Sequence, residues 1–220
     1  MKYRSQIKIL IGVILIVMFS SCGILGGDDD DSGTSTLGGD PSPMGAVGHE
    51  FGVVTPQGVD NENAVVISNS DGISTIEYTA TISNPVLMDM VKAMPDVTVN
   101  GNQASVARRY RITTKGFQSV YDEGNLTIMN YDAKPGDTYS MKRNGTTLKR
   151  QVTKVSKEDE YPWGFMMIKT IHVEETGRNI PGVSKVEFVG NHRWGMVGMK
   201  VFFEDGSTQN MTIIGQASNE

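Results

Sequence analysis

The sequence predicts a mostly β protein, built as an antiparallel β-sandwich or as paired small β-sheets, with one short α-helix at about residues 85–94. Apolar residues alternate with polar ones along residues 75–82 and 197–204, which is the period of a half-buried strand. Asn-Gly and Asp-Gly dipeptides at 144–145 and 205–206 favour two-residue hairpin turns between such runs. No long helical patterns alternate with the strands, which argues against parallel βαβ units.

Further strands and turns are expected between these segments. Asn100-Gly101 and Gly136-Asp137 mark two of the turns, since Gly and Asn tolerate the backbone angles that tight turns require. The strands are expected near residues 97–99, 105–114, 126–131, 138–143, 146–156, 165–175 and 184–189.

The helix follows from its own start and stop signals. Asn84 can cap its first turn and Pro85 suits its first position. Pro95 ends it, and because it is short it needs a sheet to pack against. Apolar residues recur at helical spacing at Leu87, Met90, Val91 and Met94.

The folded part is expected to comprise two β-rich halves. The segment Tyr131–Tyr139, rich in turn-forming residues, is a candidate boundary. The first half would cover residues 49–132 and include the helix, and the second would be a β-meander over residues 133–216. A single domain over residues 49–216 is the alternative.

The amino terminus has the three parts of a secretory signal peptide, expected over residues 1–21. Basic residues come first, and eleven apolar or glycine residues, Ile9–Phe19, follow without a charge. This run is shorter than the roughly 20 residues that a spanning helix needs. The small residues Ser20 and Ser21 then precede Cys22, the single cysteine of the chain.

The stretch Phe19-Ser20-Ser21-Cys22 resembles the lipobox of bacterial lipoproteins, with Phe19 in place of the usual leucine. This resemblance implies that Cys22 is acylated and becomes the first residue of the mature chain. Segments such as Gly164–Glu175 and Asn191–Met199 also resemble uncharacterised envelope lipoproteins of Gram-negative bacteria, and that likeness implies no activity. We therefore expect an outer-membrane lipoprotein that is held to the membrane by its lipid. It would be exposed at the cell surface if Asp28–Asp31 act as an export signal.

Residues 22–48 are expected to form a lipidated, flexible tether. They are dominated by Gly, Asp, Ser, Thr and Pro, which bury too little apolar surface to offset the entropy of ordering. Asp28–Asp31 resemble an export signal of surface-exposed lipoproteins. A solubilising spacer is the alternative, whereas a calcium site would need spaced ligands that four consecutive aspartates do not provide.

Charge and cysteine content exclude several functions. The whole chain has a net charge of −5, and loss of Lys2, Arg4 and Lys8 with the signal peptide changes it to −8. An acidic domain is a poor candidate for binding nucleic acid, which needs a basic face. With Cys22 acylated, no thiol remains for a disulfide, a nucleophile or a zinc–thiolate site.

No motif for catalysis, cofactor binding or metal binding occurs in the sequence. His49, His172 and His192 are far apart in the chain and do not form a metal-binding pattern. Arg108, Arg109 and Arg111 surround a tyrosine on an expected strand. They are interpreted as a solvated strand face, with an anion or acidic-glycan site as the alternative. We expect no cofactor and no enzymatic activity.

Two aromatic loops are the best candidates for ligand binding. Trp163 lies beside Tyr161, and Trp194 lies beside Arg193, each next to a glycine. Exposed rings there could stack on a glycan or a protein partner, although plugging the end of the core is the alternative. The expected function is thus a non-catalytic binding or structural module.

Two other functions stay open at the level of the sequence. A fimbrial or assembly subunit would need an exposed strand edge. A hydrolase acting on glycan or peptide in the envelope would need distant acids to converge, for example Glu174 with Glu187 or Glu204.

Overall fold

The computed structural model describes residues 34–54, 59–92, 96–143, 145–178, 180 and 182–215. The predicted signal peptide and Cys22 lie outside these residues. Within them the fold is mostly β and antiparallel, as predicted. The strands are β1 (Glu50–Val54), β2 (Val59–Ser70), β3 (Ile73–Ile82), β4 (Thr98–Asn100), β5 (Gln103–Thr113), β6 (Gly116–Tyr121), β7 (Gly124–Asn130), β8 (Thr138–Arg143), β9 (Thr146–Val155), β10 (Tyr161–Trp163), β11 (Met166–Ile168), β12 (Ile171–Thr176), β13 (Val183–Asn191), β14 (Gly195–Phe203) and β15 (Thr208–Gly215).

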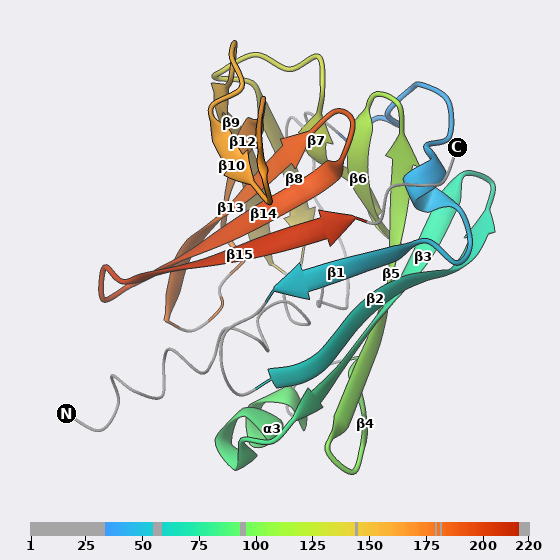
Figure 1. Cartoon of the computed structure of the whole chain (residues 1–220), viewed down its shortest axis with the longest axis vertical. Coiled ribbons are helices and arrows are strands. Elements are labelled where there is room, and N and C mark those ends of the chain that lie inside the picture. The colour runs from blue at the N-terminus through green and yellow to red at the C-terminus, as the bar shows by residue number, and fades with distance from the viewer. Residues whose placement is uncertain are drawn as a thin grey trace.

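Thirteen of the strands form one continuous sheet rather than two separate layers. Its order is β7-β6-β5-β3-β2-β1-β15-β14-β13-β12-β9-β8, and β4 adds to β5. The pairing of β1 with both β2 and β15 joins the two expected halves. The sheet curls until its edge strands β7 and β8 touch, which gives the nearly closed, barrel-like shape in Figure 1.

The main hydrophobic core fills the inside of this curl. It combines residues of the first expected half, such as Phe117 and Ile128, with residues of the second, such as Val173, Phe188 and Val201. All five are buried. Val173 and Val201 alternate with more exposed neighbours along their strands, whereas Phe117 and Ile128 lie in runs of four buried residues. Burial of such side chains, at about 1.5–3 kcal/mol each, is what stabilises a chain without disulfides.

The short helix α3 (Pro85–Lys92) begins where the sequence predicts. The amide of Met88 donates to the carbonyl of Asn84, and Met88 and Val91 are buried in a second core cluster against β2, β3 and β5. In Figure 1, α3 lies at the end where β2, β3 and β5 extend beyond the rest of the sheet. The expected end of the helix, at Met94 and Pro95, lies outside the described residues.

Part of the expected tether, residues 35–45, makes hydrogen bonds to the sheet. The buried Gln118 on β6 donates its amide to the carbonyl of Ser35 and accepts the amide of Leu37. Further on, Ser42 caps the 3-10 helix η1 (Pro43–Gly45) and its amide donates to a carbonyl at the end of β5. A buried amide side chain needs such partners, and backbone groups of this polar segment supply them.

The turns confirm the expected hairpins, with one difference. Gly145 has a φ of 73° in the β8–β9 turn, whose Asn144 lies outside the described residues. The β14–β15 connection is longer than the predicted two residues and covers 204–207. Its wider form follows from Asp205, whose carboxylate accepts the backbone amide and the hydroxyl of Ser207.

The predicted strand at 165–175 is interrupted. β11 ends at Ile168 and β12 begins at Ile171, so Lys169 and Thr170 belong to neither. Their carbonyls are used elsewhere, because Asn191 Nδ2 donates to Lys169 O and the amide of Ser156 donates to Thr170 O. This break creates the separate hairpin described next.

Candidate functional site

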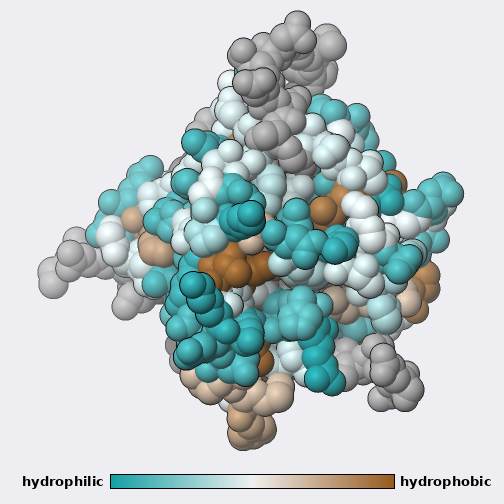
Figure 2. All heavy atoms as spheres, turned by 90° about the horizontal axis from the view of Figure 1, so that it is seen from above, coloured by the Kyte–Doolittle hydropathy of each residue, from teal (hydrophilic) through white to brown (hydrophobic). Residues whose placement is uncertain are grey.

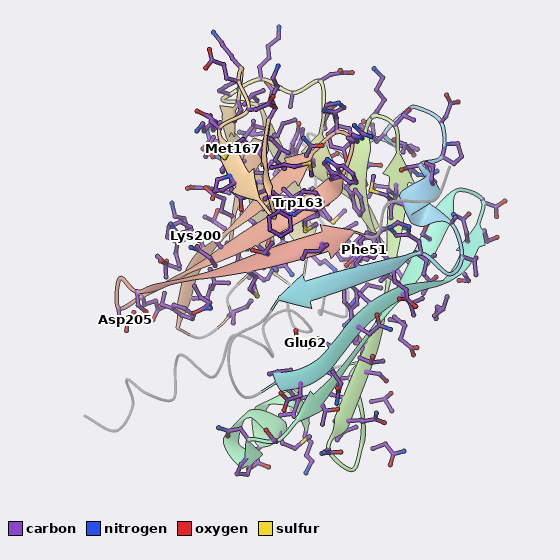
Figure 3. The ribbon with its side chains drawn as sticks, in the orientation of Figure 1. Phe51, Glu62, Trp163, Met167, Lys200 and Asp205 are labelled. Atoms are coloured by element: carbon purple, nitrogen blue, oxygen red, sulfur yellow. The ribbon has the colours of Figure 1, made fainter. Side chains whose placement is uncertain are left out.

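The β10–β11 hairpin is a two-stranded sheet that packs on the outer face of the main sheet. Trp163 and Ile168 are buried against Val189 of β13 and Val197 of β14. The indole Nε1–H of Trp163 donates to the carbonyl of Ile213 on β15 at 2.9 Å. Figure 3 shows Trp163 in front of β14 and β15 and Met167 on the outer side of the hairpin. The hairpin is therefore held firmly at its base.

The structure brings the four predicted binding residues into one area, but Trp163 is not exposed. Its side chain is buried, and its ring lies 5.1 Å from the ring of the half-buried Trp194. The guanidinium group of Arg193 lies over the ring of Trp194, with its central carbon 5.0 Å from the ring centroid. Tyr161 is half-buried. Trp163 thus packs the hairpin on to the sheet, and the ring surface that remains for a ligand belongs to Trp194.

The exposed apolar surface of the hairpin lies at its tip. Phe165 is fully exposed, and the exposed fractions of Met166 and Met167 are 44% and 52%. Sequence reasoning missed these residues, although three consecutive apolar residues after a Trp-Gly pair were the available signal. Elsewhere the surface seen in Figure 2 is mostly polar, with hydrophobic side chains in small areas. Phe165, Met166 and Met167 therefore form a candidate contact surface.

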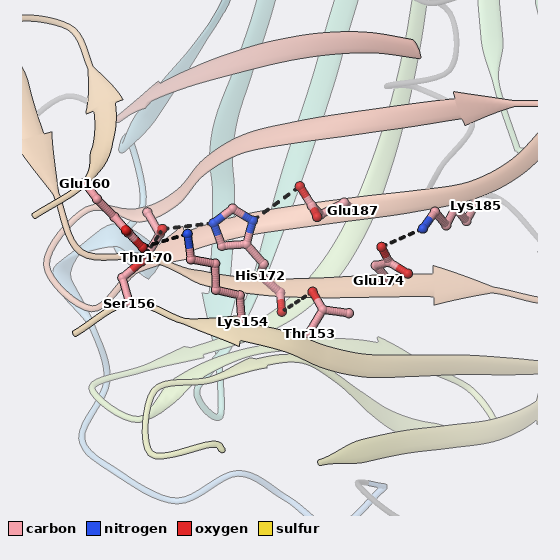
Figure 4. A network of polar contacts seen from close by, with 9 residues as sticks. All are labelled: Thr153, Lys154, Ser156, Glu160, Thr170, His172, Glu174, Lys185 and Glu187. Carbon is pink, nitrogen blue, oxygen red and sulfur yellow. Dashed lines mark hydrogen bonds and ion pairs between the residues drawn. The ribbon is translucent and has the colours of Figure 1, made fainter. Parts of the chain in front are cut away.

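Beside the hairpin, a chain of polar contacts crosses β9, β12 and β13 (Figure 4). Nδ1 of His172 lies 3.3 Å from Oε1 of Glu187, and its Nε2 lies 3.0 Å from Oγ1 of Thr170. Thr170 Oγ1 is 3.3 Å from Ser156 Oγ, which donates to Glu160 at 2.9 Å. The hydrogen bond from His172 lowers the pKa of Glu187.

This order of carboxylate, imidazole and hydroxyl is the order found in hydrolase triads. A nucleophile must also reach its substrate, and the side chains of Thr170 and Ser156 are both buried. Tyr161 covers the imidazole of His172, with ring centroids 5.9 Å apart. In this arrangement the contacts fix the His172 ring and tie the loop before β10 to the sheet.

The acids predicted for a hydrolase do not face each other across a cleft. Glu174 and Glu187 are direct cross-strand partners on the outer face of β12 and β13. Each has its own basic partner, because Lys185 Nζ lies 2.6 Å from Glu174 and His172 contacts Glu187. Glu204 lies in the β14–β15 connection. A general acid needs a raised pKa, whereas the pKa of Glu187 is lowered.

A hollow of about 370 Å³, lined by both polar and apolar residues, adjoins this network at the end of the sheet. Its lining includes Ser156 and Thr170 together with Lys115, Lys169 and His192.

No group of three or more metal-binding side chains occurs among the described residues. In the same part of the chain, no helix has the length and apolarity needed to cross a membrane.

Comparison with protein-family models, curated proteins and solved structures found no significant match.

Proposed function

We propose that this chain is a lipid-anchored protein of the outer membrane that acts as a non-catalytic binding module, and that the tip of the β10–β11 hairpin contacts a protein partner. The lipobox-like stretch ending at Cys22 supports the anchor. One observation carries the binding role, namely the exposed Phe165, Met166 and Met167 on a hairpin whose base is fixed by Trp163.

The chemistry of the tip suits a protein better than a lipid surface. Exposed aromatic and methionine side chains are enriched at protein contacts, where the flexible thioether adapts to different shapes. The loop that leads into the hairpin carries Glu158, Asp159 and Glu160, all exposed. Acids in the loop before β10 would be repelled by anionic headgroups, whereas a protein partner can complement them.

Site-specific photo-crosslinking in intact cells tests this proposal. A photoreactive residue at Phe165 is expected to give a discrete protein adduct, which Met167→Ser weakens. The matched control is the same photoreactive residue at Ile67, an apolar side chain on β2 whose exposed fraction is similar to that of Met166. Adducts with lipid alone, or equal protein adducts from Phe165 and Ile67, would contradict a protein contact at the tip.

A further inference from the structure

The inside of the curled sheet holds a cluster of four arginines, of which one is buried and three are partly buried. Four arginine side chains there are 14% exposed or less, in a chain that is acidic as a whole. They come from β5, β8, β9 and the loop after β12, and they are Arg108, Arg143, Arg150 and Arg178. Removing a cation from water costs several kcal/mol unless it is paired, so this placement requires a physical reason.

Tyr121, at the end of β6, is the common neighbour of these four arginines. The guanidinium carbon of Arg143 lies 3.9 Å from the centroid of its ring. Burial would raise the pKa of Tyr121, but the charges of Arg150 and Arg178 lower it below its usual value. Arg108 also interacts electrostatically with Tyr121 and with Arg143. The environment of the phenol is therefore strongly electropositive.

The carboxylates near the cluster do not balance it. Glu175 is fully buried and serves two arginines, with Arg150 Nε at 2.7 Å and Arg178 Nε at 2.5 Å. Arg143 lies 3.4 Å from a partly exposed glutamate, Glu123, and Arg108 lies 3.9 Å from an exposed aspartate. Four arginines thus share three acids, of which only Glu175 is buried, and the other two acids lie nearer the solvent.

Arg150 also shows unused hydrogen-bonding capacity. Its Nη1 donates at 2.9 Å to the carbonyl of Leu126 on the edge strand β7. Its Nη2 is buried and has no hydrogen-bond partner among the described residues. Leu126 lies on the edge strand that meets β8, so the cluster lies where the sheet stops short of closure.

A hollow of about 130 Å³ opens beside the cluster. Its lining includes Arg108, Arg143 and Tyr121, and a single water needs only about 10–15 Å³ of such space. We propose that this hollow binds an oxyanion, a carboxylate or phosphate group of a small ligand, between the guanidinium groups of Arg108 and Arg143. The planar donor forks of guanidinium groups match the oxygens of both groups.

Two acids on the rim of the hollow already have partners of their own. Asp122 forms an ion pair with Arg109, an exposed residue whose side chain lies on the outer face of β5. The contact between Asp96 and Arg108 is long, at 3.9 Å, and Arg108 Nη1 also donates to the carbonyl of Ala107 at 2.8 Å. This proposal does not depend on the partner contact at the hairpin tip.

Calorimetric titration of the purified full-length protein in neutral detergent tests the site. The probes are inorganic phosphate, sodium glucuronate and sodium chloride at constant ionic strength. At least one of the two oxyanions is expected to bind saturably, and Arg143→Gln is expected to weaken this binding at least tenfold. If Arg143→Gln fails to fold, Arg143→Lys takes its place. This variant keeps the charge but loses the donor fork, so it is also expected to bind the oxyanion more weakly than the wild type.

Arg193→Gln is the matched control, because it removes the same charge from an exposed position that does not line this hollow. It is expected to change the dissociation constant less than threefold. The proposal is overturned if neither oxyanion binds saturably, if chloride binds as tightly as both, or if Arg193→Gln weakens binding as much as the Arg143 variants do.

Discussion

Glu175→Gln is the substitution that tests most directly how the interior of the sheet is stabilised. Glu175 is fully buried and ion-paired with Arg150 and Arg178. The variant keeps the size of the side chain and removes its charge, so two buried guanidiniums lose their shared counter-charge. Breaking a buried ion pair from one side costs about 3–5 kcal/mol in the free energy of unfolding, and we expect a loss of this size at pH 7.

The pH dependence of this loss follows from the pKa of Glu175. Burial would raise it, but Arg178 and Arg150 lower it from 4.5 to about 2 in the folded protein. A depressed folded pKa contributes stability above the unfolded pKa, and that stability is lost as the pH falls through the folded pKa. The shift corresponds to about 3 kcal/mol, lost by the wild type between about pH 5 and pH 2.

Urea unfolding of the wild type and Glu175→Gln at pH 7, 5 and 3 measures this difference. The gap in unfolding free energy between the two proteins is expected to stay constant from pH 7 to 5 and to narrow at pH 3. Glu174→Gln is the control, since Glu174 pairs with Lys185 on the outer face and is expected to cost less than about 1 kcal/mol. A gap that is the same at pH 7 and pH 3 would refute an ionised, buried Glu175.

Three further predictions follow from single positions. Trp163→Ala removes the indole and its hydrogen bond to Ile213, so we expect a loss of about 3–5 kcal/mol in the free energy of unfolding, measured with urea. The hairpin of this variant is also expected to be cleaved earlier by proteases, and unchanged protease resistance would contradict the packing role of Trp163. Gly116→Ala places a Cβ 2.0 Å from the carbonyl oxygen of Met129 at a φ of 145°, so we expect a loss of about 2 kcal/mol or more in the same assay. A stability equal to that of the wild type would contradict this close approach of β6 and β7. Mass spectrometry of the native protein is expected to show an acylated Cys22 as the first residue. An intact Met1 or an unmodified sulfur would contradict the proposed lipid anchor.

Local patterns in the sequence predict much of the fold. Alternation along residues 75–82 and 197–204 identifies β3 and β14 because a half-buried strand repeats every two residues. Asn84 and Pro85 locate the start of α3 for an equally local reason. Other strands escaped this reasoning, such as β6 (Gly116–Tyr121), in which four consecutive residues are buried and no alternation is visible.

The candidate site depends on contacts that no local pattern specifies. Trp163 and Trp194 were each expected in a loop next to a glycine, but Trp163 lies on β10. Whether each ring is exposed depends on Ile213 and Val197, which lie far along the chain. The exposure of Phe165 follows from the same packing, because the buried base of the hairpin directs its tip outward.

The sequence by itself determined the strand-rich, antiparallel character of this protein, its hairpin turns and the position of its helix, since each depends on neighbours within a few residues. Only the tertiary structure decided that the strands form a single curled sheet, that residues 35–45 bind to it, and that Arg108, Arg143 and Arg150 meet around Tyr121. Those outcomes depend on which strands pair across long separations and on how far the sheet twists. Such pairing is a property of the whole chain, because one strand's partner is chosen in competition with all the others.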